Sequence, residues 1–252
     1  CSSDLGVAAV KDFSLDVKAG EIVGIAGIDG NGQTELIQGI TGLTKVQSGQ
    51  VVLQGQDITN KKPRQITEAG VGHIPEDRLR FGMEVDMTLS ENLALQTYYK
   101  APLSQHGVLQ ADAMDKLANE LVKEFDVRSA GIHVLAGSMS GGNQQKAVIA
   151  RELNRDNELV IAAQPTRGLD VGAIEYIHQR LIDQRNDGKA VLVVSFELDE
   201  ILNLSDRIAV INAGKVVGIV DAKDTNKQEL GLLMTGMSLA DARAALKEEV
   251  HA

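Results

Sequence analysis

One glycine-rich stretch, residues 22–38, has the residue types and spacing of a site that could bind phosphate. It reads as a buried strand, then a turn containing several glycines, then the first turns of a helix. This order aims backbone N–H groups and a helix N-terminus at one point, which suits an anion. The residues predicted to form this phosphate-binding loop are Gly27, Asp29, Gly30, Asn31, Gly32, Gln33 and Thr34.

The loop departs from the phosphate-loop pattern G-x-x-x-x-G-K-[ST] at one position. Gly27, Gly32 and Thr34 fit the pattern, whereas Gln33 occupies the lysine position. A neutral amide cannot supply the positive charge that lysine places beside the β- and γ-phosphates. The Thr34 hydroxyl stays available as a weak ligand for Mg²⁺. The alternative interpretation is a glycine turn that only joins strand to helix.

The loop needs a sheet to position it, and the rest of the chain predicts one. Continuous apolar runs at 159–163 and 190–194, and a further predicted strand at 71–74, alternate with predicted helices at 63–70, 141–153 and 171–187. This alternation is typical of a mostly parallel sheet with helices on both faces. Ligands of such sheets bind beyond the carboxyl ends of the strands. Those ends are Gly27, residues 74–76, residues 163–164 and residues 195–196.

Shorter segments predict antiparallel structure beside this sheet. Residues 10–17 alternate loosely between apolar and polar types, and residues 51–53 read as a short strand. Residues 207–211 and 215–220 are expected to pair across a turn at 212–214. Beyond Thr225 the sequence predicts a polar, helical tail.

Residues 85–137 differ in character and predict a helical insert without strands. Thr88 and Glu91 form a capping box before a helix expected to reach Tyr99. A polar break at 102–107 precedes a second helix, whose apolar face carries Met114, Leu117, Leu121 and Phe125. The expected division is 1–84, the first part of the core; 85–137, the helical subdomain; 138–222, the rest of the core; and 223–252, the tail.

Composition limits the classes of function. A formal net charge of −10, no tryptophan and 3% aromatic residues argue against nucleic-acid binding. The apolar runs are too short to cross a bilayer. The one cysteine, Cys1, excludes an internal disulfide and fits a reducing compartment. We expect Cys1 to be a junction in a chain cut from a longer parent; the alternative is the lipid-modified cysteine of a secreted protein.

Three more segments complete a recognisable set with the loop: SMSGGNQQK at 138–146, LVIAAQPTRGLD at 159–170 and SFELDE at 195–200. In this order and spacing the chain resembles the nucleotide-binding domain of an ABC transporter. It is most similar to the second, carboxyl-side domain of the tandem ATPase subunit in simple-sugar and nucleoside importers. The resemblance implies an α/β, P-loop NTPase-like ABC ATPase core with an antiparallel β subdomain and an α-helical subdomain.

The segment at 138–146 predicts an open helix N-terminus. Ser140 is placed to cap the helix, and two glycines follow, which let a phosphate approach the backbone. An ordinary capped helix does not need two glycines in its first turn, since each costs about 1 kcal/mol relative to alanine. The resemblance implies that this motif closes over ATP held by the opposing domain. Its residues are Ser140, Gly141, Gly142, Asn143 and Gln144.

Other motif positions have lost the chemistry that the family uses. Ala163 and Gln164 stand where relatives carry a magnesium-binding aspartate and a catalytic glutamate, and Phe196 replaces a histidine. Together with Gln33, they imply that this domain has no working catalytic residues of its own. The resemblance also implies that Glu76, Asp77 and Arg78 couple to the membrane permease, although Glu76 can simply begin a turn. Gly168, Leu169 and Asp170 match a segment that crosses to the partner domain; Asp170 can equally cap the next helix.

The expected function is therefore that of a catalytically degenerate domain in an importer. It contributes its motif in trans to the ATP and Mg²⁺ site of the first nucleotide-binding domain of the same subunit. Its other implied partners are membrane permease subunits and, indirectly, an extracellular substrate-binding protein, at the cytoplasmic face of the membrane. Nucleosides are favoured over simple sugars as cargo, by resemblance alone. The alternatives are a scaffold that binds no nucleotide and a self-sufficient homodimeric ATPase.

Overall fold

The computed structural model describes residues 9–250, with side chains from 9 to 247. It divides into two compact units. Unit 1 comprises residues 1–73, 157–164 and 180–252, and unit 2 comprises residues 74–156 and 165–179. Cys1, on which the expectation about a longer parent was based, lies outside the described residues.

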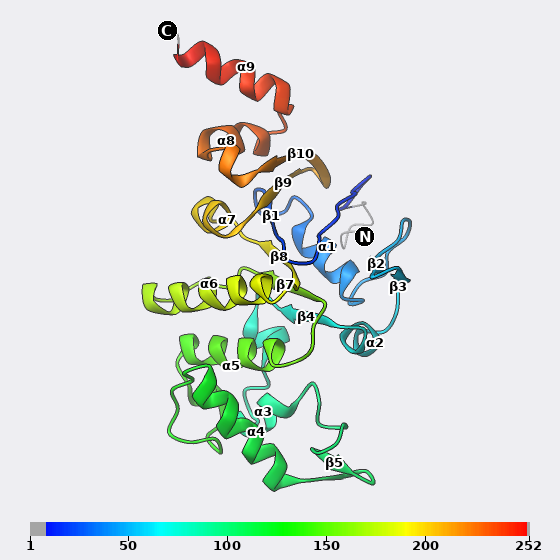
Figure 1. The fold of residues 1–252 in the computed structure, drawn as a ribbon, viewed down its shortest axis with the longest axis vertical. Coiled ribbons are helices and arrows are strands. Elements are labelled where there is room, and N and C mark those ends of the chain that lie inside the picture. Colours follow the sequence, from blue (N-terminus) through cyan, green and yellow to red (C-terminus); the bar gives the residue numbers. More distant parts are fainter. Residues whose placement is uncertain (1–8, 251–252) are drawn as a thin grey trace. The chain divides into compact units, whose positions relative to one another are not determined.

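Unit 1 is built on a six-stranded sheet (Figure 1). Along the sheet the order is β10 (Lys215–Asp221), β9 (Arg207–Asn212), β1 (Ile22–Ala26), β8 (Ala190–Val194), β7 (Leu159–Ala163) and β4 (Val71–Ile74). The pairs β1–β9, β1–β8 and β7–β8 are parallel, and β9–β10 is antiparallel. The predicted strands and the predicted pairing of the last two are confirmed.

The continuous apolar runs form strands because both faces of the sheet are covered. On one face, Val23 and Ile25 of β1 pack with Leu36 and Ile37 of helix α1 (Gln33–Ile40). Side chains alternate along a strand, so Gly24 points to the opposite face. A Cβ at Gly24 would collide with Ser205 and with Ile201 of helix α7 (Leu198–Leu204), so α7 packs directly on the strand backbone.

The remaining elements of unit 1 are short or peripheral. Strands β2 (Val52–Leu53) and β3 (Gln56–Asp57) form a two-stranded sheet, and helix α2 spans Pro63–Glu68. The tail forms a 3-10 turn η3 (Ala222–Asp224) and helices α8 (Lys227–Met234) and α9 (Leu239–Val250), as predicted. The strand predicted at 10–17 is wrong. Residues 13–18 carry no regular secondary structure, so loose alternation alone did not produce a ladder.

Unit 2 contains the helices of the middle of the chain. These are α3 (Leu89–Ala94), α4 (Ala111–Glu124) and α5 (Gly141–Leu153), with a π-helix η1 (Arg78–Gly82) and a 3-10 turn η2 (Ala136–Ser138). Leu121 and Phe125 are buried, as the predicted apolar face of α4 requires. Helix α6 (Val171–Asn186) begins in unit 2 and ends in unit 1.

Two predictions about this segment are wrong. Helix α3 begins at its Thr88–Glu91 capping box but ends at Ala94, not Tyr99. The expectation of no strand also fails, because β5 (Ser104–Gln105) and β6 (Val108–Leu109) pair in a hairpin. His106 and Gly107 form its turn with φ of 51° and 80°, the left-handed conformation that such turns require.

No helix among residues 9–250 is both long enough and apolar enough to cross a membrane.

Candidate functional site

The glycine-rich loop lies in unit 1 between β1 and α1, as predicted. Gly30 and Gly32 have φ of 84° and 102°, and Gly32 occupies the N-cap position of α1 without a side-chain cap. The first N–H groups of an α-helix have no partner within the helix. The loop and the start of α1 therefore present backbone donors to an anion, consistent with a phosphate-binding conformation.

Gln33 turns back against this loop. It is 3% exposed, and its Nε2 donates to the carbonyl of Ile28 at 3.2 Å. A Cβ at Gly27 would lie 2.5 Å from that nitrogen, so Gly27 makes room for the amide. An amide nitrogen carries two hydrogens, which leaves one for another acceptor. Gln33 thus occupies the lysine position as a neutral donor.

Asn31 fastens the loop to the turn between β9 and β10. Its Oδ1 accepts from the backbone N–H of Ala213 at 2.9 Å, and its carbonyl accepts from Gly214 at 3.0 Å. Sequence reasoning placed Asn31 in the loop but missed this anchor, because its partners are some 180 residues away.

The altered motif positions of unit 1 lie at the carboxyl edge of the sheet. Ala163 pairs with Val194, which also pairs with Ile25, so β7, β8 and β1 end side by side. Gln164 follows β7 and Phe196 follows β8. The structure therefore brings these positions to the same edge as the loop.

Gln164 is strained and incompletely satisfied. It is 6% exposed, its φ is +47°, and its Nε2 has no hydrogen-bond partner. A left-handed non-glycine residue costs about 1–2 kcal/mol. A buried polar group without a partner costs about 1–3 kcal/mol more. Backbone strain and unpaired buried polar groups are concentrated at functional sites, where a bound ligand can provide the missing hydrogen-bond partner.

The residues at the positions where the family binds magnesium do not fit that ion. Mg²⁺ requires oxygen ligands, usually one or two carboxylates. Ala163 has no ligand atom, Gln164 is an amide, and Thr34 offers one exposed hydroxyl. Among the described residues no group of three or more histidine, cysteine or acidic side chains could hold a metal ion.

The SMSGGNQQK segment lies in unit 2 and forms the start of α5. Ser140 occupies the N-cap position, but the prediction that its hydroxyl caps the helix is wrong. The hydroxyl instead accepts from Nδ2 of Asn143 at 2.9 Å, and Oδ1 of Asn143 accepts from the N–H of Arg128 at 2.7 Å. The first N–H groups of α5 therefore have no side-chain cap, and Ser140 itself is exposed.

The segment 76–78 contacts this helix within unit 2. Asp77 caps η1, because its Oδ1 accepts from the N–H groups of Leu79 and Arg80 at 3.0 and 3.1 Å. Nε of Arg78 donates to Oε1 of Gln144 at 3.4 Å. Nη2 of its guanidinium would lie 2.5 Å from a Cβ at Gly141, so the guanidinium occupies the space beside this glycine.

The segment 168–170 also lies in unit 2. Asp170 caps α6, because its Oδ1 accepts from the N–H of Ala173 at 2.9 Å; this confirms the capping interpretation. Its Oδ2 would be 3.9 Å from a Cβ at Gly142, so the cap lies beside the start of α5. Gly168 has φ of +72° and Leu169 is half-buried.

Several bonds that brace α5 were not foreseen from the sequence. Nε2 of Gln145, which is buried, donates to the carbonyl of Pro165 at 2.9 Å. Nε2 of Gln144 donates to the carbonyl of Ala136 at 3.0 Å. Lys146 bonds Asp126 at 2.8 Å, which lowers the pKa of that carboxyl. Only the run of three polar side chains after the two glycines hinted at these roles.

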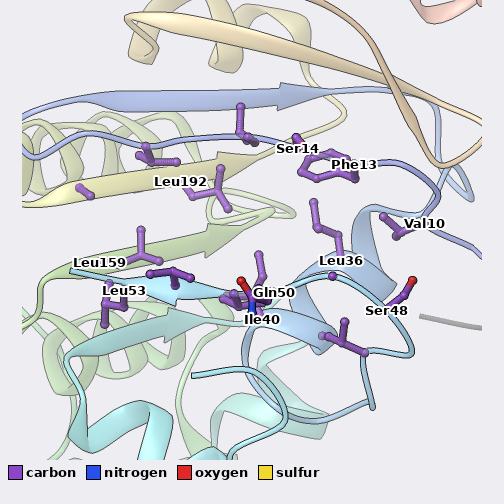
Figure 2. A pocket seen from close by; sticks show the side chains of 18 of the residues that line it. Val10, Phe13, Ser14, Leu36, Ile40, Ser48, Gln50, Leu53, Leu159 and Leu192 are labelled. Carbon is purple, nitrogen blue, oxygen red and sulfur yellow. The ribbon is translucent and has the colours of Figure 1, made fainter. Parts of the chain in front are cut away.

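A separate cavity of about 840 Å³ lies in unit 1 (Figure 2). Phe13, Leu36, Leu53 and Leu192 are among its lining residues, and Figure 2 shows them coming from the 10–17 segment, α1, β2 and β8. None of residues 27–34 lines it, and neither Gln164 nor Phe196 does. It is therefore distinct from the edge that carries the motifs.

Comparison with known proteins agrees with this geometry. The chain is 64% identical over 231 residues to the nucleoside import ATP-binding protein NupA of Lactococcus lactis subsp. cremoris (strain MG1363), covering 92% of this chain and 46% of that protein. It is 56% identical over 240 residues to the guanosine import ATP-binding protein NupO of Bacillus subtilis (strain 168), covering 95% and 47%. The chain spans about half the length of these relatives.

Solved structures share the fold. A dimeric structure of a post-hydrolysis state of the ATP-binding cassette MJ0796, bound to ADP and Pi, superposes with a TM-score of 0.72 at 27% identity. The match covers 85% of this chain and 90% of that one. Residues 10–167 also match the ABC transporter family. With its phosphate-type loop, its strand-end motifs and this fold, the chain belongs to the ABC transporter family and has the P-loop NTPase fold of its ATPases.

Proposed function

We propose that this chain is the second nucleotide-binding domain of a tandem ATPase subunit that drives nucleoside import. It would contribute α5 in trans to the ATP site of the first domain. The relatives named for nucleoside and guanosine import are 64% and 56% identical, whereas a ribose import ATP-binding protein from Lacticaseibacillus paracasei is 35% identical. Simple sugars are the second candidate cargo. The match to about half of each longer relative supports the tandem arrangement.

The observation that carries the trans role is the open N-terminus of α5. Ser140 is exposed and no side chain caps the helix. The guanidinium of Arg78 occupies the space beside Gly141, and a Cβ at Gly142 would have only Oδ2 of Asp170 nearby, at 3.9 Å. A helix N-terminus with free N–H groups stabilises negative charge. Phosphoryl transfer depends mainly on positioning and charge stabilisation, so a helix supplied by a second domain can contribute without acid–base chemistry.

The domain's own loop is proposed to be catalytically silent. ABC ATPases as a family bind ATP and Mg²⁺, but Gln33, Ala163, Gln164 and Phe196 replace the groups that this chemistry needs. Loss of a positioned acid or base costs about 10²–10⁴ in rate, and loss of one charge-stabilising donor about 10²–10³. Such losses are not additive, but the largest alone nearly abolishes turnover.

The remaining motif residues are assigned by the same proposal. Glu76, Asp77 and Arg78, with the helical segment 85–137, would dock the cytoplasmic side of a membrane permease. Residues Gly168, Leu169 and Asp170 would face the first domain. The protein would then act at the cytoplasmic face of the membrane, and an extracellular binding protein would deliver the cargo to the permease. The contacts of Arg78 and Asp170 at the start of α5 support placing these segments near the shared ATP site.

The test is Ser140→Arg in the full-length ATPase, assembled with its permease. We expect ATP turnover to fall by about 100-fold or more, because the arginine side chain occupies the space of the phosphate. Ser48→Arg, at an exposed serine in unit 1, is the matched control and should leave turnover unchanged. Unaltered turnover in Ser140→Arg would refute the trans role and favour a scaffold. ATP turnover by the 252-residue chain alone would favour a self-sufficient homodimer.

A further inference from the structure

The π-helix η1 is hydrogen-bonded to α5 at both of its ends, within unit 2. At its start, Nε of Arg78 donates to Oε1 of Gln144 at 3.4 Å, and the guanidinium occupies the space beside Gly141. At its end, the carbonyl of Gly82 accepts from Nη2 of Arg151 at 2.6 Å. Gln144 lies near the start of α5 and Arg151 near its end, so the two attachments are about 10 Å apart along the helix.

Arg151 is a buried arginine outside the motif segments of the sequence. It is 5% exposed, and its Nη1 also donates to the carbonyl of Asn92 at 3.4 Å, near the end of α3. Its Nε bonds Oε1 of Glu152 at 3.0 Å, and this buried carboxylate balances the charge of the arginine. The planar guanidinium therefore reaches three acceptors at once, an arrangement that the single ammonium of lysine does not reproduce.

The position of η1 depends on its two ends. A Cβ at Gly82 would lie 3.2 Å from Cγ of Pro75 and 3.3 Å from Cγ2 of Val148, so the end of η1 packs closely against α5. The large apolar side chains between the ends, those of Leu79 and Phe81, are 53% and 49% exposed. They contribute little burial that could hold η1 in place, so the attachments to α5 fix its position.

We propose that Arg151 is a positioning residue for the motif at the start of α5, and that it acts through η1 and Arg78. Arg151 fixes the end of η1, and η1 carries the guanidinium that lies against Gly141 and Gln144. Misplacement of a catalytic group by about 1 Å can cost about 100-fold in rate. Loss of either attachment therefore lowers turnover at the shared ATP site. This inference rests on the proposed trans role of α5 and adds to it a residue that lies near the far end of the helix.

The first test examines the attachments in the 252-residue chain by amide hydrogen exchange. The N–H of Phe81 donates to the carbonyl of Asp77 at 3.0 Å and reports on η1 itself. Arg151→Lys and Arg78→Gln should each raise its exchange rate by about threefold or more, because an η1 released at one end opens more often. Arg64→Gln, at an exposed arginine on α2, is the control and should leave the rate unchanged. Unchanged exchange in both test variants would overturn the proposal.

The second test measures ATP turnover by the full-length ATPase, purified without its permease so that a lost permease contact cannot affect the result. Arg78→Gln and Arg151→Lys should each lower turnover by about tenfold or more, whereas Arg64→Gln should not. Residues this far apart normally have independent effects, which would multiply to about 100-fold or more in the double variant. Because both act through η1, the double variant should instead lie within about threefold of the slower single variant. Multiplied losses, or unchanged turnover in the single variants, would overturn the proposal.

Gly82→Ala displaces the same end of η1 without removing a buried charge, so it serves if Arg151→Lys fails to fold by circular dichroism. Its methyl group would press on Val148, and its loss of turnover should likewise not multiply with that of Arg78→Gln. The trans role is tested separately. If Ser140→Arg abolishes turnover while Arg78→Gln, Arg151→Lys and Gly82→Ala do not lower it, the positioning role alone is refuted. If Ser140→Arg leaves turnover unaltered, the trans role is refuted, and the positioning role with it.

Discussion

Replacing Gln33 by lysine should tighten ATP binding to unit 1 without restoring ATP cleavage, so this variant tests the two properties separately. The side chain of Gln33 already lies beside Gly27 and donates to the carbonyl of Ile28. Lysine is one bond longer and can follow the same path, with its ammonium directed to the bound phosphates. The substitution therefore adds a positive charge without rebuilding the loop.

The expected gain follows from two opposing terms. A unit charge 4 Å from a phosphate oxygen contributes about 4 kcal/mol at an effective dielectric constant of 20. The position is 3% exposed, so desolvation of the ammonium cancels much of this gain. A net 1–2 kcal/mol corresponds to about 5- to 30-fold tighter ATP binding. Turnover should remain absent, because Ala163 and Gln164 still provide no metal ligand and no base.

Calorimetric titration of ATP into Gln33→Lys and the unaltered chain gives the affinities, and phosphate release gives the turnover. Gln33→Met is the control, because it keeps a long side chain but removes both donor and charge. It should bind ATP more weakly than the unaltered chain. If Gln33→Lys alone restored ATP turnover, the view that Ala163 and Gln164 make this site catalytically inactive would be refuted. Equal ATP affinity of the lysine and methionine variants would refute the electrostatic argument.

Three further predictions concern stability. Asn143→Ala removes two hydrogen bonds at the start of α5 and should lower the free energy of unfolding by about 1–2 kcal/mol, seen as a lower urea midpoint. Arg207 lowers the pKa of Glu21 below its usual 4.5 by hydrogen bonding, so Glu21 stabilises the fold above that pH and stops doing so as the pH falls through the lowered pKa. Thermal melts between pH 3 and 7 should therefore show a smaller loss of stability on acidification for Glu21→Gln than for the unaltered chain. Gly24→Ala should cost about 1–3 kcal/mol in chemical denaturation, since its methyl group collides with Ser205; an unchanged midpoint would contradict the packing of α7 on β1.

The central sheet was predictable because its strands are short continuous apolar runs bounded by glycine or polar residues. The glycines of the loop likewise predicted its left-handed turns, and the two glycines after Ser140 predicted where α5 begins. These signals are local, because a strand, a turn or a helix start depends on residues within one short window.

The parts that failed depend on contacts distant in sequence or on very short elements. Strands β5 and β6 have two residues each, too few for an alternation to be recognised. The hydroxyl of Ser140 was expected to cap α5, but Asn143 competes for it. The bond between Arg78 and Gln144 spans 66 residues, and only the fold brings the two together. The unpaired amide of Gln164 is invisible in sequence, because satisfaction of a donor is a property of its surroundings.

The bonds from Asn31 to Ala213 and Gly214 have a mechanical consequence. A ligand that displaces Asn31 must either break both bonds or move the β9–β10 hairpin with it. That hairpin is also hydrogen-bonded to the tail, because Nδ2 of Asn212 donates to the carbonyl of Met234 at 2.7 Å. The glycine-rich loop and the end of α8 are thus held to the same hairpin by hydrogen bonds, although they lie some 200 residues apart in sequence.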